Sequence, residues 1–348
     1  MLQASFLKHA LTFKKPSGTS RGVLTTKDTW FLILRDEEKL GIGECGMFRG
    51  LSYDDRPDFE TTLQWVCDNI QLGEEQLLME LSEYPAIRIG LETVFLSLRS
   101  PDPFSIFPSE FTRGEASIPI NGLIWMGSEE FMKEQIREKL KDGFGCIKMK
   151  IGAIDFETEI SLLKSIRREF SSEEIELRVD ANGAFTTSEA LEKLKRLSDL
   201  DIHSIEQPIR QGQWQEMARL CEETPLPIAL DEELIGVVAF EKKSKLLETI
   251  HPQYIILKPT LVGGFSGSDE WIAMAEQKDI GWWITSALES NVGLNAISQY
   301  TFTKNSKLPQ GLGTGSLFTN NVEAPLLVTK GTLRYQPEKQ WNIDLFSK

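Results

Sequence analysis

Cysteine, histidine and long apolar runs are all scarce in this chain. The four cysteines, Cys45, Cys67, Cys146 and Cys221, are scattered and form no CxxC pair. This spacing argues against a disulfide framework or a zinc site and favours free thiols in a reducing compartment. No apolar run approaches the ~18–20 residues of a membrane span. Lysines interrupt the first residues, which lack the apolar core of a secretory signal, so we expect a cytoplasmic protein.

Basic residues are outnumbered as well. The 348 residues include 52 acidic and 38 basic ones, giving a formal net charge of −14. Nucleic acids and anionic membranes favour a basic face, so we expect neither as a partner. No dinucleotide fingerprint opens the chain, GLGTG (311–315) has the wrong spacing for GxGxxG, and no Walker A motif is present. A small molecule is therefore the expected partner, and the pattern leaves open whether the protein is a monomer or a homo-oligomer.

The first third of the chain has a mixed pattern. One segment alternates like a strand (29–37) and a glycine-rich stretch (41–46) follows it. Helical patterns come next, over 57–71, 74–82 and 86–99, and a proline-rich connector covers 100–108. The sequence therefore predicts an α+β domain over residues 1–115.

From residue 117 onwards, short apolar strands alternate with amphipathic helices. Ser128 can cap the first of these helices, and Thr186 with Glu189 forms a capping box for the third. Eight strands with seven intervening helices indicate a (β/α)7β TIM-like barrel over residues 116–320, followed by a tail, 321–348, that returns to the first domain. The strand candidates are 117–125, 145–152, 175–182, 202–209, 226–233, 254–261, 281–288 and 308–315.

Ionisable residues stand at the ends of five successive predicted strands. They follow one another at intervals of 25–30 residues, about one βα unit each: Lys150, Asp180, Glu206, Asp231 and Lys258. All five should therefore meet at the carboxyl-terminal mouth of the barrel, where such folds hold their active sites. Because side chains alternate along a strand, Lys148 shares a face with Lys150, and Arg178 lies one layer below Asp180.

Three carboxylates that converge on one point repel each other unless a cation joins them. Oxygen ligands suit a hard ion, so we expect Asp180, Glu206 and Asp231 to bind Mg²⁺, or Mn²⁺. Lysines flanking such an ion can act as bases, which predicts removal of a proton α to a carboxylate with the enediolate held at the metal. The alternative, structural ion pairs between the three acids and Lys150 and Lys258, would bury a net negative charge.

The motifs around these residues resemble the enolase superfamily, and within it the muconate-lactonizing-enzyme subgroup with its Lys-x-Lys motif and opposing lysine. Further stretches, among them 19–32, 43–55, 284–299 and 310–321, are most similar to the o-succinylbenzoate synthase family of menaquinone biosynthesis. The superfamily motifs are IKMKIG (147–152), VDANGAF (179–185), IEQPI (205–209), ALDEEL (229–234) and LKPTLVGG (257–264).

The resemblance implies dehydration of 2-succinyl-6-hydroxy-2,4-cyclohexadiene-1-carboxylate to o-succinylbenzoate. By position, Lys150 would be the base, Lys258 a cation on the opposite ring face, and Lys148 a contact to the carboxylate. Loops of the first domain would close over the substrate, and neutral groups would receive its succinyl arm. The implied substrate-binding residues are Arg21, Arg49, Ser286, Gly313 and Thr314, and the implied supporting residues are Asn182, Glu232 and Arg178.

Related activities on the same scaffold are the main alternatives. Dipeptide epimerases of the subgroup carry an Asp-x-Asp after the eighth strand, where this chain has Gly313-Thr314-Gly315. N-succinylamino acid racemization needs the same lysines and the same succinyl pocket and stays open. A non-catalytic barrel is disfavoured because no lysine or metal ligand is lost. A sugar-acid dehydratase is disfavoured because Lys258 ends the sixth strand.

Overall fold

A three-stranded antiparallel sheet and three helices make up the first part of the chain. The computed structural model describes residues 2–19 and 22–346. Over residues 29–34, strand β2 is buried on both faces, because Trp30 and its alternate neighbours pack on the helices while Phe31 and Ile33 pack on a separate apolar cluster. The elements are β1 (Gln3–Thr19), β2 (Gly22–Asp36), β3 (Lys39–Cys45), α1 (Phe59–Asp68), η1 (Ile70–Leu72), α2 (Glu74–Glu80) and α3 (Pro85–Arg99).

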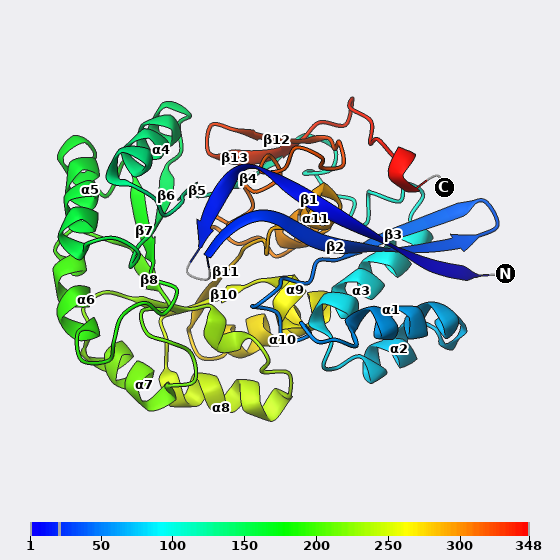
Figure 1. Ribbon diagram of the computed structural model, residues 1–348, viewed down its shortest axis with the longest axis horizontal. Helices are drawn as coiled ribbons and strands as arrows, with labels where there is room; N and C mark the ends of the chain where they lie inside the picture. Colours follow the sequence, from blue (N-terminus) through cyan, green and yellow to red (C-terminus); the bar gives the residue numbers. More distant parts are fainter. Residues whose placement is uncertain (1, 20–21, 347–348) are drawn as a thin grey trace.

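The second part is a seven-stranded parallel sheet that curls into a barrel, with helices around its outer face (Figure 1). This architecture confirms the predicted fold class. The strands run in the order β11-β10-β9-β8-β7-β6-β5. Their bounds are β5 (Gly122–Ile124), β6 (Cys146–Lys150), β7 (Glu176–Asp180), β8 (Ser204–Glu206), β9 (Ile228–Leu230), β10 (Tyr254–Leu257) and β11 (Gly281–Ile284).

The outer helices follow the strands in alternation. Ser128 caps the first of them as predicted, since its side chain accepts a hydrogen bond from the backbone N–H of Phe131. The helices are α4 (Glu129–Lys141), α5 (Phe156–Glu169), α6 (Ala190–Ser198), α7 (Trp214–Glu223), η2 (Glu232–Leu234), α8 (Phe240–Ile250), α9 (Pro259–Val262), α10 (Gly264–Glu276) and α11 (Asn291–Thr303). No helix in the described part of the chain is long and apolar enough to cross a membrane.

The predicted eighth strand, 308–315, is reduced to two single-residue bridges. Gln310 pairs with Ile120 and Gly311 pairs with Thr285. Pro309 has no N–H to donate, and three glycines in the segment offer no side chain to pack, so a longer strand is not favoured here. The bridges still join the two edges of the curled sheet.

The predicted first barrel strand, 117–125, is split. Residues Ser117–Pro119 form β4, which pairs with a hairpin of the tail, β12 (Leu326–Thr329) and β13 (Thr332–Tyr335). Further on, Trp341 stacks on Phe104 with ring centroids 4.1 Å apart. The tail thus adds a small sheet beside the barrel before its end contacts the first part of the chain. The domain limits drawn from the sequence stay predictions.

Two buried glutamates of the first part hold the N-termini of barrel helices. Glu44 accepts hydrogen bonds from the backbone N–H groups of Ser290 and Gly293 at the start of α11. Glu92 accepts from the N–H groups of Phe265 and Ser266 at the start of α10. Carboxylates at helix N-termini satisfy orphan donors and complement the helix dipole. These contacts place the capping region (residues 2–99) on the barrel next to its mouth.

Candidate active site

The ends of β6, β7 and β8 lie in register, which brings three charged side chains into one row. Lys150 pairs with Asp180 across β6 and β7, and Asp180 pairs with Glu206 across β7 and β8. Asp231 comes directly after β9 and Lys258 directly after β10. The structure therefore places these five residues at the carboxyl-terminal mouth of the barrel.

Two lysines of β6 lie between the carboxylates of the neighbouring strands. Lys148 Nζ is 3.2 Å from Asp180 Oδ2 and 2.6 Å from Glu206 Oε2. Lys150 Nζ is 2.8 Å from the same Asp180 oxygen and 2.7 Å from Asn182 Oδ1. One carboxylate oxygen of Asp180 is thus shared by two ammonium groups.

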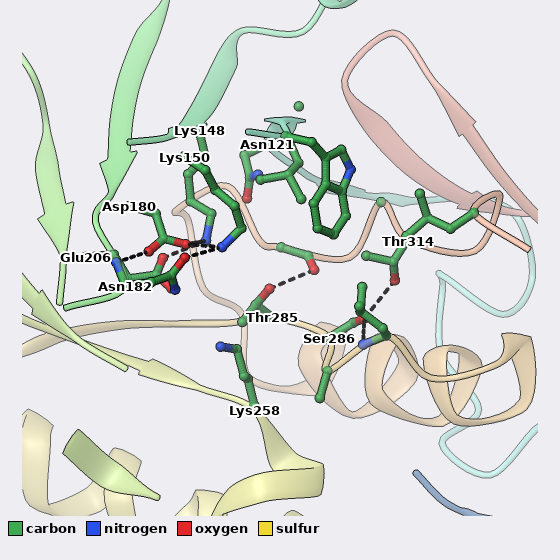
Figure 2. Close-up of a pocket in the computed structure, with 18 of the residues that line it drawn as sticks. Asn121, Lys148, Lys150, Asp180, Asn182, Glu206, Lys258, Thr285, Ser286 and Thr314 are labelled. Carbon is green, nitrogen blue, oxygen red and sulfur yellow. Dashed lines mark hydrogen bonds and ion pairs between the residues drawn. The ribbon is translucent and has the colours of Figure 1, made fainter. Parts of the chain in front are cut away.

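The third lysine enters from the other side. Lys258 is ion-paired with Asp231 Oδ2. Figure 2 shows Lys148 and Lys150 projecting from one side of the cavity and Lys258 from the opposite side. A molecule bound between them would have an amine on each of its faces.

Burial and charge act on the carboxylates in opposite senses. Burial by itself raises the pKa of Asp180, but the ammonium groups of Lys150 and Lys148 outweigh it and hold that pKa well below its usual range. Burial, reinforced by the charge of Asp180, raises the pKa of Glu206 to about 8 although Lys148 opposes this. The site thus holds more negative charge than its two nearest lysines fully compensate.

The lysines are affected in the reverse way. Burial by itself lowers the pKa of Lys148, but the charges of Glu206 and Asp180 raise it above its usual range. The pKa of Lys258 is raised for the same reason, with Asp231 as the main partner outweighing burial. The raised pKa values of both lysines therefore depend on the same carboxylates that would bind a metal ion.

The carboxylates match a hard cation in their chemistry. Glu206 Oε1 is buried and has no hydrogen-bond partner among the described residues. Within residues 2–19 and 22–346, no three His, Cys, Asp or Glu side chains already lie close enough together to hold an ion. Lys148 and Lys150 instead contact the Asp180 and Glu206 oxygens. Oxygen donors from Asp180, Glu206 and Asp231 are the ligand type that Mg²⁺ prefers.

Asn182 and Glu232 support the row of charges. Asn182 accepts a hydrogen bond from Lys150 and donates one from Nδ2 to Glu232 Oε1, 3.0 Å away. Its backbone has a φ of 43°, a left-handed conformation that asparagine tolerates better than most residues. The two successive hydrogen bonds from Lys150 to Asn182 and from Asn182 to Glu232 thus restrain the lysine amine.

A cavity of about 190 Å³ opens beside these charges. Ser286 Oγ and Thr314 Oγ1 are 2.7 Å apart and lie on the side of the cavity away from Lys148 and Lys150 (Figure 2), and Gly313 also lines it. The remaining wall is largely apolar and includes Phe48, Leu51, Trp125, Leu288 and Leu317. The cavity therefore has a charged end and a neutral end.

The structure describes two of the three predicted arginines, and neither of them lines the cavity. Arg21 falls outside the described residues. Arg49 is not among the residues that line the cavity, since its guanidinium pairs with Asp55 at 2.7 Å; its neighbours Phe48 and Leu51 face the cavity instead. Arg178 lies deeper in the barrel, with its guanidinium 4.2 Å from the centre of the Trp283 ring.

Sequence reasoning missed several residues of the site. Gln207, buried and with a φ of 40°, donates to Glu233 and accepts from the backbone N–H of Asp231, so it ties the ends of β8 and β9 together. Asn121, directly before β5, and Trp125, directly after it, also line the cavity. The IEQP motif pointed to Gln207, but no pattern pointed to the other two.

Comparisons with known proteins agree with this geometry. A family model described as "Enolase C-terminal domain-like" matches residues 131–338. The chain is 48% identical over 363 residues to the o-succinylbenzoate synthase of Desulfotalea psychrophila, covering 95% of this chain and 98% of that protein. The crystal structure of MenC from the same organism superimposes with a TM-score of 0.85 at 45% identity, covering 96% of this chain and 99% of that one.

More distant relatives share the scaffold. The N-succinylamino acid racemase of Thermus thermophilus is 35% identical over 159 residues, covering 45% of this chain and 40% of that protein. The substrate-liganded L-Ala-D/L-Glu epimerase of Bacillus subtilis superimposes with a TM-score of 0.81 at 20% identity, covering 96% of this chain and 95% of that one, which shows the fold alone. The chain belongs to the enolase superfamily, as the resemblance predicted.

Proposed function

We propose that this chain is a lyase that dehydrates 2-succinyl-6-hydroxy-2,4-cyclohexadiene-1-carboxylate to o-succinylbenzoate, a step of menaquinone biosynthesis. The observation that carries this proposal is the placement of Lys150 and Lys258 on opposite sides of one cavity, beside three carboxylates at strand ends. Near-complete coverage by a 48% identical o-succinylbenzoate synthase supports the substrate. We further propose that it acts in the cytoplasm.

Lys150 is the group proposed to move protons. In its neutral form, its amine takes the proton from the ring carbon that bears the carboxylate. The resulting ammonium then gives that proton to the hydroxyl on the same ring face, the C–O bond breaks, and water leaves. No other reactant is needed, because loss of water alone makes the ring aromatic. The hydrogen bond to Asn182 holds the Lys150 amine in position during both transfers.

Lys258 and Lys148 act as cations. Lys258 faces the other side of the ring and stabilises the negative charge that develops when the proton is removed. Lys148 lies at the base of the charged end, within hydrogen-bonding distance of Asp180 and Glu206, and helps to hold the carboxylate of the substrate. Their fixed positions avoid reorganisation during the reaction.

Superfamily members generally use Mg²⁺, and we propose that Asp180, Glu206 and Asp231 hold it here, with Mn²⁺ as a substitute. When bound, the ion supplies a Lewis acid that neutralises the substrate carboxylate and makes its α-proton more acidic. The unpaired Glu206 Oε1 supports this proposal. Glu232 and Asn182 would hold the surrounding side chains in place.

The neutral end of the cavity suits the succinyl arm. Ser286, Gly313 and Thr314 offer hydroxyl groups and backbone near the end of the cavity, while Phe48 and Trp125 exclude water along its length. No acidic residue lines the described part of this end, which disfavours a substrate with an ammonium group there. This supports a succinyl substrate over a dipeptide.

An absorbance assay tests the proposal. Purified protein with Mg²⁺ and the cyclohexadiene carboxylate should form o-succinylbenzoate with a kcat/KM of at least ~10⁴ M⁻¹s⁻¹, within the usual enzyme range. Absence of turnover in protein that still binds Mg²⁺ would refute the substrate while leaving the class of chemistry in place.

The opposed lysines also favour a second activity, racemization of N-succinylamino acids. Two bases on opposite faces can remove a proton from one side and return it from the other. Exchange of the α-proton of an N-succinylamino acid in D₂O measures this directly. Exchange at less than a hundredth of the dehydration rate would leave it as a side reaction.

A further inference from the structure

A buried lysine of the capping region lies outside the reaction described above. Lys27 of β2 is only 6% exposed, and its Nζ donates to the backbone oxygen of Gly46 at 3.1 Å. Burial lowers its pKa, while the nearby charges of Glu44 and Glu289 oppose that effect. Lysine is seldom buried this deeply unless its ammonium group is paired with an acidic or hydrogen-bonding group.

The backbone carbonyl that accepts this hydrogen bond belongs to Gly46, directly before a segment that lines the cavity. Gly46 is followed by the segment Met47–Leu51, whose Phe48 and Leu51 side chains line the cavity. Gly46 also lies tightly against the barrel, because a Cβ built on it would be 3.2 Å from Glu289 Cγ and 3.6 Å from Lys27 Nζ. Lys27, Gly46 and Glu289 therefore form one contact between the two regions.

On the barrel side, Glu289 organises two segments of the site. Its carboxylate accepts a hydrogen bond from Thr260 Oγ1, two residues after Lys258. It also accepts from the backbone N–H of Ala287, directly after Ser286, with N–O distances of 3.1 and 2.8 Å. Glu289 and Thr260 are almost completely buried.

We infer that Lys27 is a positioning residue: with Glu289 it holds the Phe48 wall of the capping region against the Ser286 and Lys258 segments of the barrel. Burial raises the pKa of the Glu289 carboxyl, and the nearby charge of Lys27 opposes that rise and so favours the ionised form, which accepts the hydrogen bonds from Thr260 and Ala287. Lys27 touches none of the residues proposed to move protons. The kinetic part of this inference rests on the proposed function.

The Phe48 and Ser286 walls contact the part of the substrate that is proposed not to react, and they bind it equally in the ground state and the transition state. Interactions of that kind set KM and leave kcat unchanged. Lys27→Met should therefore raise KM about tenfold or more while kcat stays within about threefold. Glu289→Gln should raise KM similarly, and the double variant should be no worse than either single one, because the two residues act as a pair.

Lys243 supplies the matched control. It is also a buried lysine, 2% exposed, ion-paired with Glu270 at 2.8 Å on the outer side of the barrel. Lys243→Met should lower Tm and leave KM within about twofold. A Lys27→Met variant that lowers Tm alone, as this control does, would overturn the positioning role.

Hydrogen exchange makes the test independent of the substrate. In Lys27→Met, backbone amides of 46–51 and of 285–289 should exchange about tenfold faster or more, in both segments together, whereas Lys243→Met leaves them unchanged. Unchanged exchange would overturn the inference even in an active enzyme, and faster exchange would support it even if the proposed substrate fails. Should Lys27→Met not fold, Thr260→Val, which removes only the hydroxyl that Glu289 accepts from, should loosen 285–289 in the same way.

Discussion

The barrel and the capping region build the same cavity by different means. The barrel supplies charged side chains from the ends of regular strands, where the register of β6, β7 and β8 aligns Lys150, Asp180 and Glu206. The capping region supplies apolar side chains from a loop, and Phe48 and Leu51 reach the cavity only because buried groups such as Glu44 dock that loop. The charged groups therefore come from the barrel alone, whereas the apolar wall is shared between the capping loop and barrel residues such as Trp125.

Removal of the metal ion should cause the largest loss of activity, because the charged groups of the barrel are proposed to act through it. Treatment with EDTA should abolish turnover, because the three carboxylates would then hold no cation to neutralise the substrate carboxylate, and added Mg²⁺ should restore it. Turnover assayed before and after dialysis measures this. Full activity in protein shown by elemental analysis to lack metal would contradict the three-carboxylate site.

Replacing the proposed base is the next largest change. Lys150→Ala should reduce kcat by about 10²–10⁴-fold, the usual contribution of a general base, with Tm nearly unchanged. Lys164→Ala, at an exposed position of α5, is the control and should match the unsubstituted enzyme. A Lys150→Ala variant within tenfold of normal kcat would exclude the role of Lys150 as base.

The docking of the capping region should show itself in stability instead. Glu92→Ala leaves the buried N–H group of Phe265 and the partly buried one of Ser266 without their acceptor. We expect a loss of about 2–3 kcal/mol in the free energy of unfolding, measured with urea. Glu92→Gln keeps an acceptor and should lose less. A tenfold lower kcat for Glu92→Ala in fully folded protein would contradict the claim that this docking contact contributes to stability and not to the chemical step.

The smallest expected effect concerns the pH dependence of stability at Glu159, a buried residue of α5 in the barrel. Burial raises the pKa of Glu159 from 4.5 to about 7, although backbone N–H groups of the loop after β6 lower it in part. The folded protein thus binds this proton more tightly than the unfolded chain, so the stabilisation is complete below pH 4.5 and is lost as pH rises through 7.

Glu159→Gln should remove this dependence. Between pH 5 and pH 8, the unsubstituted protein should lose about 1–2 kcal/mol of unfolding free energy relative to the variant, within the limit set by the change in pKa. Urea unfolding at both pH values measures the difference. Parallel pH profiles of the two proteins would show that Glu159 does not titrate in this range.

Much of the barrel and its charged end could be predicted from the chain alone. Each charged residue came at the end of an apolar strand, and a parallel fold places such ends at one edge. The eighth strand could not be predicted in detail, because single-residue bridges at Gln310 and Gly311 leave no periodic pattern. Arg49 shows the same limit for loops, since its pairing with Asp55 depends on how the loop turns.

What the sequence by itself determined is the order and spacing of Lys150, Asp180, Glu206, Asp231 and Lys258, and hence the kind of chemistry at the mouth of the barrel. Only the tertiary structure decided how the cavity is closed and held. Lys27, Gly46 and Glu289 lie more than 200 residues apart at the extremes, yet they meet at one buried contact. Local periodicity records which face of a strand or helix is buried, but carries no information about which distant side chains will share that burial.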